Sequence, residues 1–405
     1  MDATIANDGR RTEGRILGLI SAGHFMSHVY MLTLPPLFPV LKEAFGVGYT
    51  ELGLLMTLIY GMSAVTQVPV GFLVDRFGAR RMLTLGLAVI SIGFGLVGLA
   101  PSFWAMAALG IVAAMGHSVF HPADYALLSA SISPGRMARA FGIHTFAGHL
   151  GSAATPATMI LLSEAVGWRA ALLTVGLVGL IILALITTQW NRLSEDALPP
   201  AKSAKTAGPG AAPAKSGLAV VLSRPMITFF LFFATLSMSS TGMQAFSVAA
   251  LVALHGTTIE TASAVLTVYL TCSALGILLG GEISSRTDRH ALVAAIVFVV
   301  KAVMILAIAF LDLPFLVLVP MMAVMGLGQG IIRPARDMMV KAAAPKGSMG
   351  KAFGFVSGGI AAGSAIAPIP FGYLIDTGHP QGVFLLIAAF MIVALGTVAV
   401  PKTTH

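Results

Sequence analysis

The sequence predicts an all-α membrane protein with twelve transmembrane helices arranged as two pseudo-symmetric six-helix bundles. Hydrophobic residues make up 57% of the 405 residues, charged residues only 10%, and the mean hydropathy is +0.91. A water-soluble domain with a polar surface does not reach such values. Two further observations predict the same fold class: the number of apolar runs, and a repeat that relates the two halves of the chain.

Twelve apolar runs have the length of about 20 residues that a helix needs to cross the hydrocarbon core of a bilayer. They begin near residues 15, 50, 82, 103, 138, 168, 225, 258, 291, 314, 349 and 380. Because lipid offers the backbone no hydrogen-bond partners, each run is expected to be helical.

The distribution of Lys and Arg predicts the orientation of these helices. One alternating set of connecting segments holds Lys42 and Arg169 alone, the spans hold Lys301, Arg333 and Arg336, and the remaining Lys and Arg residues fall in the other set. Basic loops stay on the cytoplasmic side. We therefore expect a multi-pass protein of the cell inner membrane with both termini and the central loop in the cytoplasm.

The two halves repeat with a constant offset of 212 residues, which is the distance from Gly116 to Gly328. Under this offset Pro122 meets Pro334, and Pro156 meets Pro368. Such repeats are a common plan of transporters. The predicted parts are a cytoplasmic tail (1–14), a first bundle (15–190), an Ala-, Pro-, Lys- and Gly-rich cytoplasmic linker (191–217), a second bundle (218–401) and a second tail (402–405).

Composition excludes several other classes of protein. The net charge of +8 could indicate a nucleic-acid partner, but the basic residues sit in short gaps between apolar runs, so we expect none. The single cysteine, Cys272, lies inside an apolar run, which excludes a disulfide framework and a cysteine-based metal site. No nucleophile, base and orienting residue occur at recognisable spacing, and no phosphate-binding loop is present, so we expect neither an enzyme nor an ATP-driven pump.

A loop motif identifies a family resemblance. Residues 71–81 read GFLVDRFGARR, which matches the Gly-x-x-x-Asp-Arg-x-Gly-x-Arg-Arg motif of the major facilitator superfamily, and the chain resembles that family over its whole length. The segments SVFHP (118–122) and GHFMSHVY (23–30) are similar to those of the fosmidomycin-resistance group of efflux proteins. The resemblance implies the major facilitator fold and a role in conformational control for Asp75, Arg76, Arg80 and Arg81.

Helix five also resembles the antiporter motif of the superfamily through Gly142, Gly151 and Pro156. The same spacing recurs at Gly354, Gly363 and Pro368, so repeat architecture explains it equally well. Near the end of helix eight, Glu282 takes an apolar position, where it could carry protons or pair with Arg286 one turn on. We group Glu282 with the residues of conformational control.

Ionisable side chains at membrane depth are costly and commonly mark a transport pathway. His24 and His28 share one face of helix one, and His117, His121 and Asp124 form one stripe on helix four. Adding the offset of 212 residues to the three positions of the second stripe gives Gln329, Arg333 and Arg336 on helix ten. The candidate substrate-binding or proton-coupling residues are His24, His28, Tyr30, His117, His121, Asp124, His149, Gln244, Arg333 and Arg336.

These residue types suggest the chemistry of the cargo. The resemblance implies that helices one, four, seven and ten line the cavity, so the two stripes are expected to face each other. Arginine binds carboxylate and phosphate-like groups through bidentate hydrogen bonds, and histidine titrates near physiological pH. Against this, single histidines in a bundle are more often packing residues, and the arginines could serve as snorkelling or structurally paired groups.

We therefore expect a secondary active transporter that works by alternating access and couples protons to the export of a small anionic or zwitterionic compound. One alternative is uptake or efflux of a transition metal or metal chelate through the histidines, because imidazole suits such metals. Another is a membrane sensor that does not transport. We expect the chain to act as a monomer in the lipid bilayer, with no cofactor and no resident metal.

Overall fold

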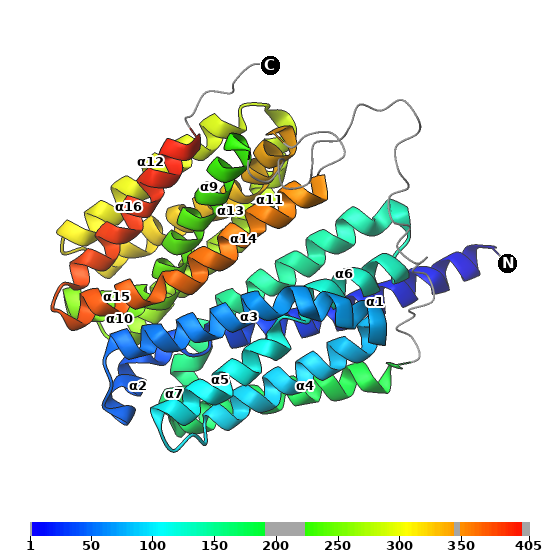
Figure 1. Cartoon of the computed structure of the whole chain (residues 1–405), viewed down its shortest axis with the longest axis horizontal. Helices are drawn as coiled ribbons and strands as arrows, with labels where there is room; N and C mark the ends of the chain where they lie inside the picture. Colours follow the sequence, from blue (N-terminus) through cyan, green and yellow to red (C-terminus); the bar gives the residue numbers. More distant parts are fainter. Residues whose placement is uncertain (1, 191–222, 344–348, 399–405) are drawn as a thin grey trace. The chain divides into compact units, whose positions relative to one another are not determined.

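The computed structural model describes residues 2–190, 223–343 and 349–398. Within these ranges the regular elements are all helices (Figure 1), which confirms the predicted all-α class. Residues 2–14, expected to form a tail, are helical and run directly into the first span. The predicted linker (191–217) and the tail at 402–405 lie outside the described residues.

Eleven helical segments in the described part of the chain are long and apolar enough to cross a membrane. One of them, at 139–188, contains Gly167 with φ 81° and ψ 152°, a backbone conformation that ends one helix and starts the next. This single long segment therefore accounts for two predicted spans, and the structure agrees with the expected twelve.

The chain divides into two compact units. The first holds residues 1–33, 62–155 and 162–211, and the second holds 34–61, 156–161 and 212–405. Residues 34–61 and 156–161, which the sequence assigned to the first bundle, thus group with the second unit. The predicted domain boundaries remain a prediction.

The described part of the first unit is built from six helices and one short turn, and two of these helices also contribute to the second unit. In it α4 packs on α5, and α6 packs on both α1 and α4. Its elements are α1 (Asp2–Leu32), α4 (Ala79–Val97), α5 (Phe103–His117), α6 (Phe120–Ser131), the 3-10 turn η2 (Pro134–Arg136), the larger part of α3 (Tyr49–Phe77) and most of α7 (Met137–Thr188).

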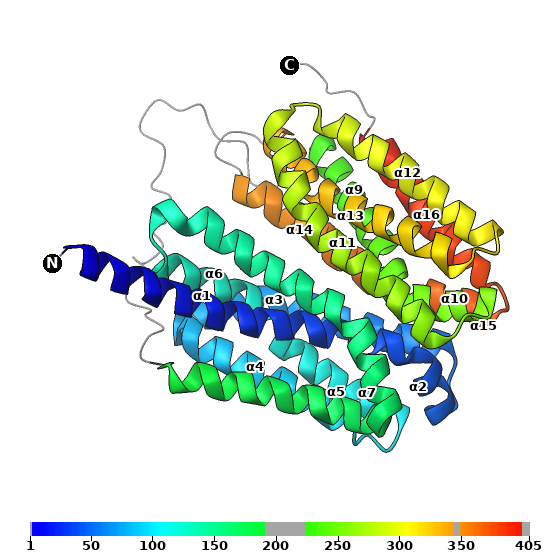
Figure 2. The same ribbon diagram turned by 180° about the vertical axis from the view of Figure 1, so that it is seen from behind.

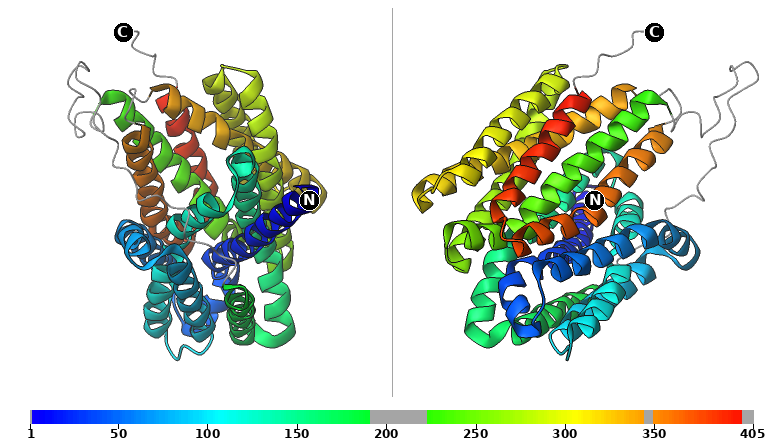
Figure 3. Two further views of the ribbon diagram at one scale, coloured as in Figure 1. Left: turned by 90° about the vertical axis from the view of Figure 1, so that its right-hand side faces the viewer. Right: turned by 60° about the vertical axis from the view of Figure 1, so that its left-hand side comes forward.

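The second unit pairs its long helices in the same manner. The most extensively packed helix pairs are α11 with α13, α9 with α14, and α12 with α16. Figures 2 and 3 show the helices of each pair lying side by side. The elements are η1 (Pro35–Leu37), α2 (Phe38–Phe45), α9 (Arg224–Thr241), η4 (Gly242–Phe246), α10 (Ser247–His255), α11 (Ile259–Arg286), α12 (His290–Phe310), α13 (Phe315–Ala343), α14 (Met349–Ile366), α15 (Pro368–Asp376) and α16 (Pro380–Val398).

Three predicted spans are irregular near their middle, and in two of them a proline is the reason. The span α5–α6 is interrupted at Ser118, because Pro122 has no N–H to donate to the Ser118 carbonyl. Pro368 divides α14 from α15 in the same way. The span α9–α10 contains the π-helical turn η4, a feature that often occurs at functional sites.

Close glycine packing and one carboxylate join α3 to α15 in the second unit. A Cβ atom on Gly53 would lie 2.5 Å from the Pro368 carbonyl oxygen, so these backbones approach as only glycine allows. The Asp376 carboxylate accepts hydrogen bonds from the backbone N–H groups of Tyr49 and Thr50 at 2.8 and 2.7 Å, and from the Thr50 hydroxyl at 2.7 Å. Asp376 therefore caps the positive N-terminus of α3.

Replacing Asp376 with Ala is expected to lower the stability of the protein by about 2 kcal/mol, because two N–H groups at the start of α3 lose a charged acceptor. The melting temperature of the purified protein measures this loss. Asp312→Ala is the matched control, since the Asp312 side chain is 95% exposed. Equal melting temperatures for the two variants would contradict a capping role for Asp376.

Candidate functional site

Six histidines gather in the first unit and form what we call the histidine cluster. Its centre is His24, whose ring centroid lies 4.0 Å from that of His144, 4.7 Å from His28 and 5.5 Å from His121. The ring centroids of His28 and His149 lie 5.6 Å apart, and those of His117 and His121 lie 6.5 Å apart. The members are His24 and His28 on α1, His117 on α5, His121 on α6, and His144 and His149 on α7.

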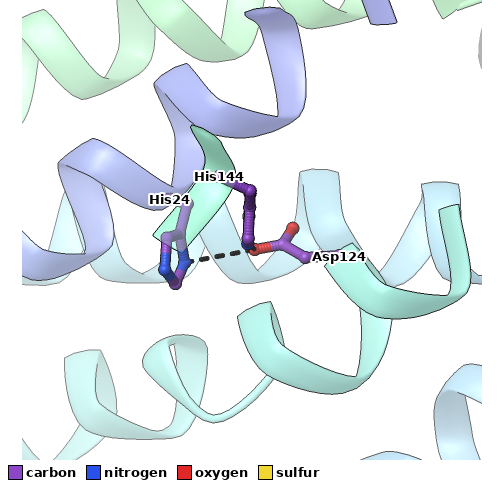
Figure 4. Close-up of side chains that lie close together, drawn as sticks. All are labelled: His24, Asp124 and His144. Atoms are coloured by element: carbon purple, nitrogen blue, oxygen red, sulfur yellow. Dashed lines mark ion pairs between the residues drawn. The ribbon is translucent and has the colours of Figure 1, made fainter. Parts of the chain in front are cut away.

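Asp124 is fully buried beside two rings of this cluster. Its Oδ2 atom is 3.3 Å from His24 Nδ1 and 3.3 Å from His144 Nε2 (Figure 4), within ion-pair distance of both rings. Neither carboxylate oxygen has a hydrogen-bond partner of proper geometry among the described residues. A buried carboxylate without a hydrogen-bond partner is unfavourable unless a positive charge lies beside it. A protonated imidazole or a bound cation can provide that charge.

Local structure brings these rings together. A Cβ atom on Gly148 would lie 2.6 Å from His24 Nε2 and 2.8 Å from His28 Cδ2, so glycine at this position makes room for both rings. Two hydroxyl groups orient the outer members: Ser152 Oγ lies 3.0 Å from His28 Nδ1, and Ser63 Oγ lies 2.9 Å from His117 Nδ1.

The second unit carries cations in place of these imidazoles. The guanidinium of Arg336 lies 4.6 Å from the Phe233 ring centroid, and its Nε donates to Asp337 Oδ1 at 3.0 Å. Arg333 lies one turn earlier on α13 and is half-buried. Gln329, one turn earlier again, is buried and bonds the ammonium of Lys301 on α12.

The two units place different chemistry at equivalent positions. The contact between His28 and Ser152 has its counterpart in the contact between Ser237 and Ser364, whose hydroxyl oxygens are 2.7 Å apart. Ser364 follows Ser152 by the same 212 residues that relate Arg336 to Asp124, whereas Ser237 follows His28 by 209 residues, as Phe233 follows His24.

The central contact repeats as well. Asp124 lies against the ring of His24 in the first unit, and Arg336 lies against the ring of Phe233 in the second. One architecture thus holds a carboxylate among imidazoles in one unit and a guanidinium beside an aromatic ring in the other.

Two predicted site residues lie outside these clusters. Tyr30 is buried, and its hydroxyl contacts Ser91 Oγ and the Val175 carbonyl oxygen, each at 3.0 Å. Tyr30 therefore contributes to packing between α1, α4 and α7, and the substrate or proton role expected for it stays a prediction. Gln244 is half-buried in the π-helical turn η4, and its role stays a prediction.

The residues expected to control conformation lie at helix ends. Arg80 donates to the Trp190 carbonyl oxygen at 2.9 Å and stacks on the Trp190 ring at 4.2 Å, so it ties the start of α4 to the chain just after α7. Asp75, Arg76 and Arg81 are exposed. Glu282 pairs with Arg286 at 2.5 to 2.6 Å, as one of its two predicted roles requires.

Sequence reasoning missed His144 and Lys301. His144 lies five residues before His149, so the spacing of four that selected most of the other histidines did not include it. Lys301 was recognised as a cation inside an apolar run but was not included among the candidate site residues. Its position inside a span is the signal that could have selected it. No metal ligands were predicted, yet ligand atoms of His24, Asp124 and His144 lie within 4.8 Å of one another.

Comparison with known proteins decides the family. The sequence matches the Major Facilitator Superfamily over residues 20–254 and again over 233–405. The chain belongs to the Major Facilitator Superfamily. The resemblance drawn from the loop motif is thereby confirmed, as is the predicted fold.

Curated relatives and solved structures agree with this family. The chain is 27% identical over 183 residues to the fosmidomycin resistance protein of Escherichia coli K12, and 26% identical over 171 residues to a probable sulfoacetate transporter of Cupriavidus necator. These matches cover 45% and 42% of this chain, and 45% and 40% of the relatives, so less than half of each relative is spanned.

Among solved structures, the chain is similar to a bacterial homologue of the human lysosomal transporter Spinster, in an inward-facing and occupied conformation. The TM-score is 0.76, with 14% identity and 95% coverage of both chains, which shows the shared fold. Together with the family match, this likeness places the chain among multi-pass membrane proteins with the major facilitator fold.

Proposed function

We propose that this chain is a secondary active transporter of the inner membrane that works by alternating access and couples proton movement to the export of a small anionic or zwitterionic compound. The observation that carries the proposal is the pair of equivalent positions 124 and 336, which hold a buried carboxylate among histidines in one unit and a guanidinium in the other.

The histidine cluster supports proton coupling. Asp124 and the rings of His24 and His144 share one buried contact, and protonating either imidazole would supply the missing counter-charge. Further rings extend from this contact to the half-buried His28 and His149, so protons have neighbouring acceptors along the cluster. Buried chains of carboxylate and imidazole groups are the usual proton relays of transporters.

The second unit supports an anionic cargo. Arg333, Arg336 and Lys301 bring three cations into one membrane-embedded region, with Asp337 beside Arg336. Such a region repels a bare metal cation and attracts oxyanions. The names of the two relatives agree with this class, because fosmidomycin is a phosphonic acid and sulfoacetate carries a sulfonate and a carboxylate.

Export, the monomeric state and the cytoplasmic position of both termini belong to the same proposal. The name of the fosmidomycin resistance protein supports export, and the excess of Lys and Arg in alternate loops supports the orientation.

Reconstitution into liposomes with a trapped pH dye tests the proposal, with fosmidomycin, sulfoacetate, Zn²⁺ and the neutral polyol erythritol as probes under an imposed proton gradient. Fosmidomycin or sulfoacetate is expected to trigger proton flux, and Arg336→Met is expected to reduce that flux at least about tenfold by removing a charged hydrogen-bond donor. Lys341→Met, an exposed change on the same helix, is the control. The absence of proton flux with every probe would overturn the transporter proposal and favour a sensor.

One observation favours a second candidate, the transport of a transition metal. Tetrahedral coordination with bonds of about 2.1 Å separates two ligand atoms by about 3.4 Å, and the two nitrogens lie 3.3 Å from Asp124 Oδ2. His24, Asp124 and His144 could therefore hold Zn²⁺ with a fourth position open. Flux triggered by Zn²⁺ and by neither anion would promote this candidate.

A further inference from the structure

Lys301, one of the three cations of the second unit, is buried and has a surrounding of its own. It lies near the middle of α12 with 2% of its surface exposed. Its stem runs along Gly328, where a Cβ atom would lie 3.6 Å from Lys301 Cδ. The ammonium nitrogen lies 6.0 Å from the Tyr269 ring centroid and donates to Gln329 Oε1.

The surroundings of this ammonium hold no counter-ion among the described residues. Helix α12 packs on α13 and α16, and α16 carries no ionisable residue. The single carboxylate on α13, Asp337, bonds Arg336, while Arg333 adds repulsion. From α11 and α9 the facing groups are the neutral Tyr269 and Ser240. An uncompensated buried charge of this kind is strongly unfavourable.

Two hydrogen bonds connect the Lys301 ammonium to the half-buried hydroxyl group of Ser240. An ammonium can only donate, so it fixes the Gln329 amide with Oε1 toward Lys301 and Nε2 away from it. Nε2 then donates to Ser240 Oγ at 2.8 Å. Because this hydroxyl oxygen is already an acceptor, the hydrogen of Ser240 is left for a further acceptor, and Ser240 lies half-buried on α9.

We propose that Lys301, acting through Gln329 and Ser240, is the charge-selective element of an oxyanion subsite in the second unit, where the cargo's carboxylate, phosphonate or sulfonate supplies the missing counter-charge. The inference rests on the proposed function, since it names the group of the anionic cargo that this unit recognises. Lys301 is a positioning residue, because its own nitrogen is enclosed and Ser240 presents the donor.

Melting temperatures of the purified protein, titrated with sulfoacetate, fosmidomycin and erythritol, test this role. Without an anion, Lys301→Met is expected to melt at a higher temperature than the wild type, because an unpaired buried charge is replaced by an apolar chain of similar length. Its affinity for both oxyanions is expected to fall at least about tenfold. Erythritol should stabilise neither protein.

A second variant keeps Lys301 and supplies the counter-charge from the protein. Gln329→Glu should place a carboxylate against the ammonium, and it is expected to lose oxyanion affinity to a similar degree. Lys301→Arg, which keeps the charge, should retain part of the affinity, and the exposed Lys341→Met should behave as the wild type.

Three results would overturn the inference: wild-type oxyanion affinity in Lys301→Met, a lower melting temperature for that variant without an anion, or a wild type that neither oxyanion stabilises. The liposome assay separates this failure from that of the proposed function. Anion-triggered flux that is equal in wild type and Lys301→Met would leave the transporter proposal standing and remove the role of Lys301.

Discussion

Replacing Asp124 with Asn is expected to abolish proton-coupled flux, with a loss of about a hundredfold or more, the scale of removing a proton-transfer group. The change keeps the size of the side chain and removes its charge. Protonation of His24 or His144 is then no longer stabilised, because each ring lies 3.3 Å from the lost carboxylate. The anion-triggered signal of the liposome assay measures the effect.

Asp312→Asn makes the same chemical change at a carboxylate that is 95% exposed, and it should leave the flux unaltered. Because Asp124 is buried, the melting temperature of Asp124→Asn must be measured beside the flux. A folded Asp124→Asn protein with wild-type flux would show that the histidine cluster is packing and that protons travel elsewhere.

Gly151→Val is expected to destabilise the first unit by about 3 kcal/mol or more, the upper range for overpacked interiors. A Cβ atom at Gly151 would collide with the carbonyl oxygen of Phe25 and lie 3.1 Å from its carbonyl carbon. These are backbone atoms of α1 and cannot swing aside as a flexible side chain would. Helices α1 and α7 would have to separate at the level of the histidine cluster.

Gly142 on the same helix provides the matched control, because a Cβ atom placed there would meet no atom within 4 Å. Gly142→Val is expected to keep the stability within the range of ordinary surface changes, about 0.5 kcal/mol. Similar melting temperatures for the two variants would contradict the packing role of Gly151. Gly363 should match Gly151, since its Cβ would collide with the Ala234 carbonyl oxygen.

This contrast also bears on the antiporter motif. Gly151 and Gly363 are explained by helix packing in their own units, so their recurrence reflects the duplicated architecture. A Cβ atom on Gly142 or Gly354 would meet nothing within 4 Å, and packing does not account for these two glycines. The glycine spacing therefore carries no weight for the direction of transport.

The amino-acid sequence alone was enough to predict the helical class, the number of spans and the family. These depend on composition, on runs of about 20 apolar residues and on the motif at 71–81, which are properties of the chain read in order. It also selected Asp124 and five of the six histidines of the cluster. Four of those five were found because side chains four apart share a helix face.

Which of these side chains meet depends on how the helices pack, and the sequence did not predict it. Tyr30 is close to His28 in the chain, yet its hydroxyl contacts Ser91 and Val175. His144 has no histidine four residues away on α7, yet it stacks on His24 from another helix. Lys301 and Gln329 come from different helices and join through one buried hydrogen bond. Periodicity reports the face of one helix, whereas the partner of a buried charge is set by how helices far apart in the sequence pack together.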